Sequence, residues 1–161
     1  LVEGVAQVAE AAAADGVTAA LEPEPGMLVE TVDDYGRLKA DLAARTSAPL
    51  RLALDTGHLL VTGERDPAAA VAEFAGDLGT VAIEDMRRGV HEHLPFGQGD
   101  MDIPAVLAAL DAIGFDRLVC VELSRESHRA HLAVPESLAW LKSRLPAASG
   151  QPLDQPHKRS A

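Results

Sequence analysis

The sequence predicts an α/β fold in which helices flank a parallel sheet. Two observations support this prediction: four short apolar runs have the length of strands buried on both faces, and segments with helical spacing separate them. A helix between two strands lets the chain return and run in the same direction again, which favours a parallel sheet. The 161-residue chain is therefore expected to contain four βα units after a leading helix.

Each predicted strand is a short apolar run that ends in an acidic residue. The four runs cover residues 17–21, 50–54, 80–83 and 118–121. The acids that follow them are Glu22, Asp55, Glu84 and Glu122. Because the carboxyl ends of parallel strands meet at one side of a barrel, all four acids are expected on one rim.

The segments between the strands show the apolar spacing of helices. The leading helix stops at Gly16, and the next predicted helix covers residues 31–45. Asp66 before Pro67 and, later, Asp102 are predicted N-caps. The apolar positions of the later helices are Val71, Phe74, Ala75 and Leu78, then Val106, Leu107, Leu110 and Ile113, and finally Leu138, Leu141 and Leu145.

Such strands suit an open doubly wound sheet or a closed barrel, and the pattern alone leaves both open. Barrel enzymes with eight βα units run to about 250 residues. Four units would be half of such a barrel, and the start at Leu1, inside a helical pattern without a cap, agrees with this. Residues 1–146 are predicted to form this partial barrel, and the polar residues 147–161 a disordered C-terminal tail.

Composition favours a soluble globular protein, with 47% hydrophobic residues. No run approaches the roughly 18 apolar residues of a membrane span, so no membrane partner is expected. The 14 basic and 25 acidic residues give a net charge of −11, which disfavours binding to nucleic acid. The single cysteine, Cys120, lies in an apolar run and has no partner for an intramolecular disulfide, so a cytoplasmic location is expected.

Four acids that converge on one rim would repel one another unless a cation or a bound proton lay between them. Oxygen ligands suit Mg, Mn or Ca, and an added imidazole shifts the preference toward Mn, Co, Zn or Fe. A divalent metal is the simplest interpretation. The alternative is that each acid caps the next helix or faces solvent, and its repetition in four units weakens this alternative without removing it.

Three histidines lie close to these acids in the sequence. His58 follows Asp55 by three residues, so both can project into one site from a strand end and its turn. His91 and His93, in the loop after the third strand, can share one side of an extended segment. Imidazoles in such positions act as metal ligands or as acid–base groups.

The same loop contains Arg88 and the pair Gly97-x-Gly99. Arg88 is the expected contact for an anion or oxyanion, because a guanidinium suits phosphate, carboxylate and enediolate oxygens. The glycine pair could approach a substrate phosphate, although a turn before a helix would also use glycine.

Four segments resemble the xylose isomerase-like barrel superfamily, and more narrowly its sugar phosphate isomerase/epimerase members. They read LEPEPG, LDTGH, IEDMRRGVHEHLPFGQGDMD and VELSRESH and lie between about residues 17 and 128, in the family's order. The resemblance implies that the chain is the C-terminal half, strands 5 to 8, of a (β/α)8 TIM barrel. The missing N-terminal half is then an expected partner, and a homo-oligomer is another.

The resemblance also implies a metal site, with acids from the fifth, sixth and eighth strands and a histidine from the seventh. The acids are matched here by Glu22, Asp55 and Glu122. Ala82 stands where the family has its histidine, and alanine is no metal ligand. His93, which resembles a ligand of related barrels that bind several metals, or Glu84 would have to substitute; otherwise the site is weakened or inactive.

The implied reaction is isomerisation or epimerisation of a keto sugar or hydroxy-ketone by proton transfer through an enediolate. Glu22 and Glu122 would be the catalytic groups, and His58 and Arg88 resemble the family's substrate-binding residues. The expected cofactor is a divalent ion (Mn, Mg, Co or Zn), and the expected substrate is a small sugar or sugar phosphate. Two alternatives are an AP-endonuclease-like metal-dependent phosphodiesterase and a catalytically inactive barrel fragment.

Overall fold

The computed structural model describes residues 1–145, and a four-stranded parallel sheet lies at their centre. The strands lie in the order β1-β2-β3-β6. They span Ala19–Leu21 (β1), Leu50–Asp55 (β2), Leu78–Ile83 (β3) and Val119–Val121 (β6). The prediction of an α/β fold with parallel strands is therefore confirmed. The tail predicted for residues 147–161 lies outside the described part of the chain.

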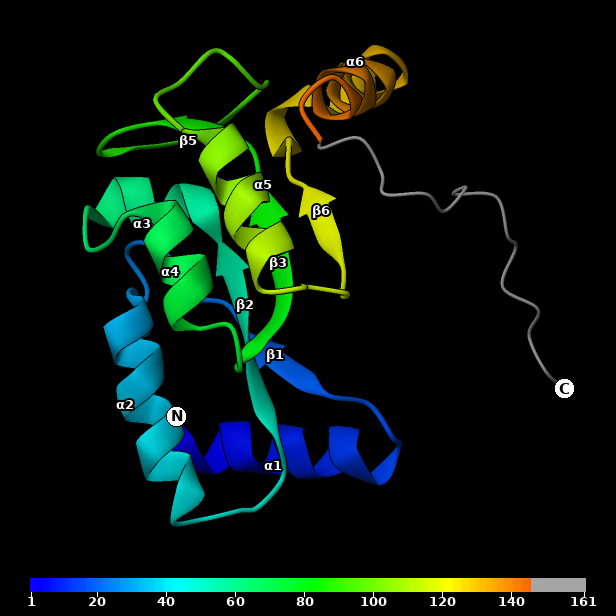
Figure 1. The fold of residues 1–161 in the computed structure, drawn as a ribbon. Coiled ribbons are helices and arrows are strands. Elements are labelled where there is room, and N and C mark those ends of the chain that lie inside the picture. The colour runs from blue at the N-terminus through cyan, green and yellow to red at the C-terminus, as the bar shows by residue number, and fades with distance from the viewer. Residues whose placement is uncertain (146–161) are drawn as a thin grey trace, which may run out of the picture.

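Helices connect the strands and lie beside the sheet. They span Val2–Ala14 (α1), Val32–Ala43 (α2), Thr56–Thr62 (α3), Pro67–Glu73 (α4), Ile103–Ala112 (α5) and Ala130–Lys142 (α6), with a short 3-10 helix at Ser124–Arg129 (η1). Figure 1 shows α4 and α5 in front of β2 and β3, whereas α6 lies beyond the end of β6. No helix within the described residues is long and apolar enough to cross a membrane.

The helices begin at the capping residues that their sequences favour. Thr31 and Asp34 form a capping box at the start of α2. Asp66 caps α4 and Asp102 caps α5, each by accepting a hydrogen bond from the backbone N–H three residues later. These caps fix where each loop after a strand ends and the next helix starts.

Several predicted helical positions lie outside the helices. Phe74 and Ala75 follow α4, Ile113 follows α5, and Leu145 follows α6. The largest error concerns Leu78. Leu78 was expected on a helix because of its spacing from Phe74, but it is the first residue of β3. The helix α4 ends at Glu73. The N–H groups of Asp77 and Leu78 both donate to the carbonyl oxygen of Phe74, which closes a turn. A four-residue spacing of buried apolar residues fits a helix, and it equally fits a helix end followed by a tight turn.

The segment after β3, expected to be a long loop, contains an antiparallel hairpin. Its strands span Asp85–Arg87 (β4) and Val90–Leu94 (β5). The helix α3 likewise occupies residues that follow β2 directly, where only a turn was expected. Seven residues are too few for helical periodicity to be visible in the sequence. Both additions lie at the carboxyl ends of the strands, where the predicted site residues are.

The two faces of the sheet differ in what they contact. Leu52 and Leu54 belong to the hydrophobic core, together with Val71 of α4 and Val106 of α5. Alternation along β2 directs the intervening Ala53 and the terminal Asp55 to the opposite face. The helices therefore cover one face, and the other face leads to the strand-end acids.

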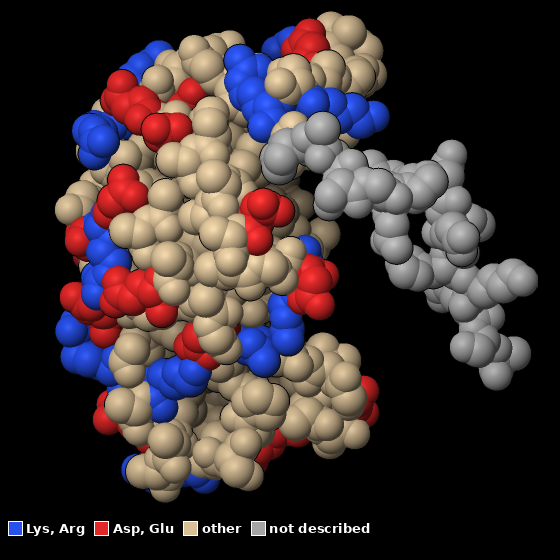
Figure 2. Space-filling model, in the orientation of Figure 1, with Lys and Arg blue, Asp and Glu red and all other residues tan. Residues whose placement is uncertain are grey.

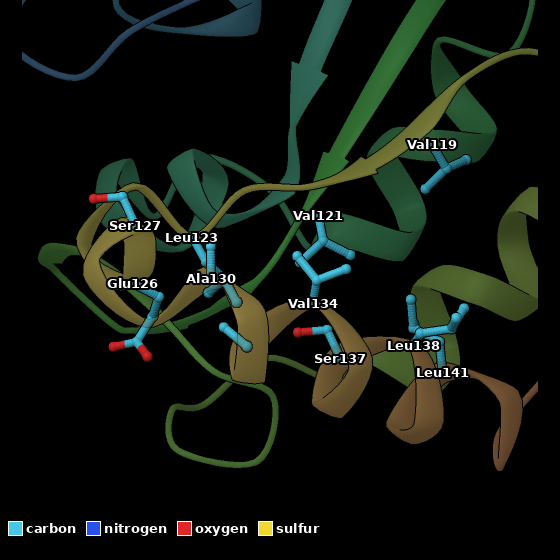
Figure 3. Close-up of a pocket in the computed structure, with 11 residues that line it drawn as sticks. Val119, Val121, Leu123, Glu126, Ser127, Ala130, Val134, Ser137, Leu138 and Leu141 are labelled. Atoms are coloured by element: carbon cyan, nitrogen blue, oxygen red, sulfur yellow. The ribbon is translucent and has the colours of Figure 1, made fainter.

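A groove of about 490 Å³ lies between β6 and α6 and is lined mainly by apolar side chains (Figure 3). Val121 lines it from the strand, and Val134, Leu138 and Leu141 line it from α6. Val134 is 67% exposed and Leu138 is 49% exposed. In the described part of the chain, β6 pairs only with β3, and β1 pairs only with β2. Two strand edges and an apolar groove are thus available for association.

We expect the 161-residue chain, when produced alone, to associate in solution, because the open edges and the groove beside α6 favour contact with other chains. Size-exclusion chromatography with multi-angle light scattering should show dimers or larger species. The substitution Leu138→Lys should reduce association, since a charge in the groove disfavours its burial. A monodisperse wild-type monomer with a sharp thermal transition would contradict the expectation and identify a self-sufficient open sheet.

Candidate metal centre

The pairing of the strands places the predicted acids on one face of the sheet. Asp55 on β2 pairs with Ala82 on β3, and Ala82 pairs with Cys120 on β6. Glu84 and Glu122 each follow these partners by two residues. Because side chains alternate along a strand, a step of two residues keeps both acids on the face of Asp55.

Three of the acids form a group at the rim of the sheet. Glu22, Asp55 and Glu122 offer carboxylate oxygens that all lie within 4.8 Å of one another. The side chain of Glu22 is 41% exposed, whereas that of Asp55 is fully buried. These three residues are called the rim group below. The strand-end positions that the sequence indicated therefore converge in the folded chain.

The carboxylate of Asp55 has two different roles. Its Oδ1 accepts hydrogen bonds from the backbone N–H groups of Gly57 (2.7 Å) and His58 (3.1 Å), which caps α3. Its Oδ2 is buried and has no hydrogen-bond partner among residues 1–145. The capping alternative thus accounts for one oxygen of Asp55 and leaves the other available to a ligand.

His58 faces the same space from the first turn of α3. Its Nδ1 lies 3.0 Å from the carbonyl oxygen of Pro23, and because a carbonyl only accepts, this nitrogen holds the proton. The other nitrogen, Nε2, lies 3.5 Å from Asp55 Oδ2 and 3.7 Å from Glu24 Oε2. The bond to Pro23 therefore orients the ring, and Nε2 points to the acids.

The hairpin brings two further imidazoles over the site. The ring centroids of His58, His91 and His93 lie between 4.9 and 6.2 Å apart, and one nitrogen from each ring falls within a 4.8 Å group. His91 Nε2 also lies 3.8 Å from Glu24 Oε1. His91 and His93 share one side of β5, as their spacing of two residues predicts.

Glu84 lies deeper than the rim group. It is fully buried, and neither of its carboxylate oxygens has a hydrogen-bond partner in the described chain. Glu84, Asp55 and His93 each offer one ligand atom within 4.8 Å, and these residues are called the inner group below. His93 Nδ1, which is also buried and unpartnered, lies 4.0 Å from Glu84 Oε1.

Without a cation, burial and neighbouring negative charge raise the pKa of two of the acids. Burial raises the pKa of Glu84 to about 10, and the charge of Asp55 adds to the effect. Glu84 and Asp55 can form a hydrogen bond only when one of the two carboxyl groups is protonated. When both are ionised, neither oxygen of Glu84 has a hydrogen-bond partner among residues 1–145. Burial, followed by the charge of Asp55, also raises the pKa of Glu22.

A glycine makes the close approach of Glu84 to α3 sterically allowed. A Cβ atom at Gly57 would lie 2.1 Å from Glu84 Oε1, far inside van der Waals contact. Gly57 is the glycine of the DTGH segment, so this segment supplies a buried carboxylate oxygen, a cap, a histidine and the space for Glu84. The sequence shows the glycine but not the residue that it accommodates.

Arg88 lies apart from these groups. It is exposed in the turn of the hairpin, where its backbone N–H donates to Asp100 Oδ2 at 3.1 Å. Its side chain lines a small pocket with Asp66 and Asp100, outside the clustered ligand atoms. The structure therefore brings Glu22, Asp55, Glu122, His58 and His93 together and leaves Arg88 outside.

Glu24 joins the cluster although it was not among the predicted site residues. The only sign of it in the sequence is its place as the second acid of the LEPEPG segment.

Asp85 holds the hairpin and the following loop in place. Its Oδ1 accepts from the N–H groups of Met86 and Met101, both at 3.0 Å, and its Oδ2 accepts from Gly97 at 2.7 Å. A Cβ at Gly99 would lie 2.4 Å from Asp85 Oδ1. The two glycines thus let the loop wrap a buried carboxylate, which favours the turn interpretation over phosphate binding.

Residues 1–144 match a family model described as xylose isomerase-like TIM barrel. A 2-oxo-tetronate isomerase from Cupriavidus necator is 28% identical over 145 residues, which cover 87% of this chain and 51% of that protein. The structure of an L-ribulose 3-epimerase shares 25% identity with a TM-score of 0.70, over 89% of this chain and 52% of its own. The IolI protein, crystallised with a zinc atom, shares 25% identity with a TM-score of 0.65, over 89% and 52%. The chain spans about half the length of these relatives.

The substitution Asp85→Asn should destabilise the protein by about 2 kcal/mol, because its amide group would face the Gly97 N–H and leave buried donors opposed. Urea unfolding of the full-length protein measures this. The control is Asp100→Asn at an exposed position, for which we expect a change of about 0.5 kcal/mol or less. Equal effects of the two substitutions would show that Asp85 does not organise the loop.

Proposed function

Because the chain belongs to the xylose isomerase-like TIM barrel family, we propose that it supplies strands 5 to 8 of a sugar isomerase or epimerase that uses a divalent metal. The isomerase and epimerase relatives support the reaction class. The rim group carries the proposal, because its three carboxylates converge within 4.8 Å at the strand ends. Since the chain spans about half of those relatives, the activity is proposed for the whole protein.

A divalent cation fits the rim group. Asp55 Oδ2 is buried without a partner among residues 1–145, and an unpaired carboxylate oxygen in such a place is costly. Three carboxylates suit Mg or Mn, and the nearby His93 extends the set of suitable ions to Co and Zn. When bound, the cation would polarise the carbonyl and neighbouring hydroxyl oxygens of the substrate. The zinc atom in the IolI structure is consistent with this assignment.

Glu22 and Glu122 are the proposed proton-transfer groups. They follow β1 and β6, the two outer strands, so they approach the space above Asp55 from opposite sides. One of the two, as a carboxylate, would remove the proton from the carbon beside the carbonyl, which gives an enediolate. The other, in its protonated form, would return a proton, and both groups would regain their starting protonation by exchange with solvent. A carboxylate is a weak base for a carbon acid, so polarisation of the substrate by the cation would supply much of the driving force.

His58 and Arg88 are the proposed contacts for substrate oxygens. Because His58 Nδ1 donates to Pro23, its Nε2 is left to accept a hydrogen bond from a substrate hydroxyl. Arg88 would bind a more distant oxygen or a phosphate, in keeping with its exposed place in the hairpin turn. A sugar and a sugar phosphate are both within this substrate class.

A metal-dependent phosphodiesterase is the second candidate, favoured by the three imidazoles that could hold a further cation. The charge of the molecule opposes it. The chain carries a net charge of −11, and on the face shown in Figure 2 the basic side chains are interspersed with acidic ones. Cleavage of DNA containing an abasic site, assayed at low salt, distinguishes this candidate from an isomerase.

Metal binding is the first test of the proposal. The purified full-length protein should contain a divalent metal, and Glu122→Ala should lower its affinity by about tenfold or more, because one of three converging oxygens is lost. Elemental analysis after equilibrium dialysis measures this. Glu10→Ala, a substitution of an exposed acid on α1, should leave the metal content unchanged. Equal metal occupancy in Glu122→Ala and wild type would remove the rim group from the site.

Proton exchange is the second test. The full-length protein with added Mn²⁺ should exchange the proton beside the carbonyl of ketopentoses or ketohexoses for deuterium in D₂O, followed by NMR. Glu22→Gln and Glu122→Gln should each slow the exchange about 10²-fold or more, since each removes a proton-transfer group. Glu10→Gln serves as the matched control. Exchange at the wild-type rate in both site variants would contradict the assigned roles.

A further inference from the structure

We propose that Asp55, Glu84 and His93 form a second cation site beneath the rim group. Each of these residues has a buried ligand atom without a hydrogen-bond partner among residues 1–145, namely Asp55 Oδ2, both oxygens of Glu84, and His93 Nδ1. One ligand atom from each of the three residues lies within 4.8 Å of the other two, and His93 Nδ1 lies 4.0 Å from Glu84 Oε1. Unpartnered donors and acceptors are rare in a folded interior, so several that face one another call for an occupant.

Glu84 is the strongest indication of an occupant. Its side chain is fully buried, and among residues 1–145 no lysine or arginine pairs with it, so only a cation or a proton shared with Asp55 would balance the two neighbouring carboxyl groups. A buried carboxylate without such a partner is strongly destabilising. The glycine at position 57 makes room for Oε1, which would otherwise meet a Cβ at 2.1 Å. The chain therefore accommodates Glu84 in this place instead of excluding it.

The ligand set identifies the class of ion. Two carboxylates and one imidazole nitrogen favour Zn, Mn, Co or Fe over Mg or Ca, which prefer oxygen ligands alone. His93 Nδ1 lies 4.0 Å from Glu84 Oε1 and would be the nitrogen that binds the ion. Binding requires this nitrogen to be unprotonated, so the proton of the neutral ring would be on Nε2. Nδ1 of His93 is thus the atom that reports on this site.

The inner group differs from the rim group in two of its three residues, Glu84 and His93 in place of Glu22 and Glu122. Asp55 belongs to both. A substitution at Glu84 therefore removes a ligand from the inner group alone, and a substitution at Glu122 removes a ligand from the rim group alone. The inference stands without the proposed reaction, since it concerns binding of an ion and not turnover.

The test is a titration of the full-length protein with Zn²⁺ alone, followed by the ¹⁵N NMR signals of the histidine rings. In wild type the Nδ1 signal of His93 should shift, and His93→Gln identifies it. In Glu84→Gln the affinity read from this signal should fall at least about tenfold, as loss of even an outer partner of a metal ligand costs about 10–100-fold. In Glu122→Gln this signal should still titrate, with a smaller loss of affinity than in Glu84→Gln, because a neighbouring charge is lost but no ligand of the inner group.

Thermal unfolding of each variant shows whether it is folded. Without metal, Glu84→Gln should melt at or above the wild-type temperature, because it removes an ionisable group that burial and the charge of Asp55 both disfavour. Added Zn²⁺ should raise the melting temperature of wild type and of Glu122→Gln by more than that of Glu84→Gln or His93→Gln. His93→Gln, at a partly accessible position of the hairpin, gives the same information if Glu84→Gln fails to fold.

Three results would overturn the proposal. A His93 signal whose titration is lost in His91→Gln and unchanged in Glu84→Gln would place the ion among the three imidazoles instead. Equal affinity in wild type and Glu84→Gln would exclude Glu84 as a ligand. The absence of any Zn²⁺-dependent shift at His93 would leave a proton shared between Asp55 and Glu84 as the occupant. None of these results depends on whether the protein catalyses proton exchange. The proposed function is therefore tested independently of the inner group.

Discussion

The divided role of the Asp55 carboxylate is the constraint on which the site depends. One oxygen caps α3 through two backbone N–H groups, which fixes the side chain without using the second oxygen. The second oxygen is then held in place, dry and unpaired among the described residues, between Glu22, Glu84 and Glu122. A carboxylate that is positioned by the backbone and free at one atom is a preorganised ligand.

The surrounding elements serve this arrangement. The parallel pairing of β2, β3 and β6 brings their terminal acids to one face, and the cap at Asp55 starts α3, which presents His58. Asp85 holds the hairpin that carries His91 and His93. Repulsion among the acids opposes this fold, so a bound cation would stabilise the folded chain as well as serve the proposed reaction.

The rim group and the inner group suggest two different roles within one centre. The rim group is partly open to solvent, as the proposed sugar site would require, whereas Asp55 and Glu84 of the inner group are buried. An ion in the inner group would neutralise Glu84 and leave the rim group to interact with substrate. The position of Ala82 next to Asp55 is consistent with this, because its methyl group offers no ligand and Glu84, two residues later, does.

The sequence by itself determined the parallel α/β fold, the N-caps and the strand-end acids, because these depend on short-range patterns: apolar runs, capping residues, and acids directly after strands. It also determined the family, through four motifs in order. It did not reveal that Leu78 starts a strand, that α3 and the hairpin exist, or that Arg88 lies apart, because seven-residue elements and turns leave no periodic signal. Only the tertiary structure decided which oxygen of Asp55 is free, and which histidine meets the buried Glu84, because those depend on contacts between residues far apart in the chain.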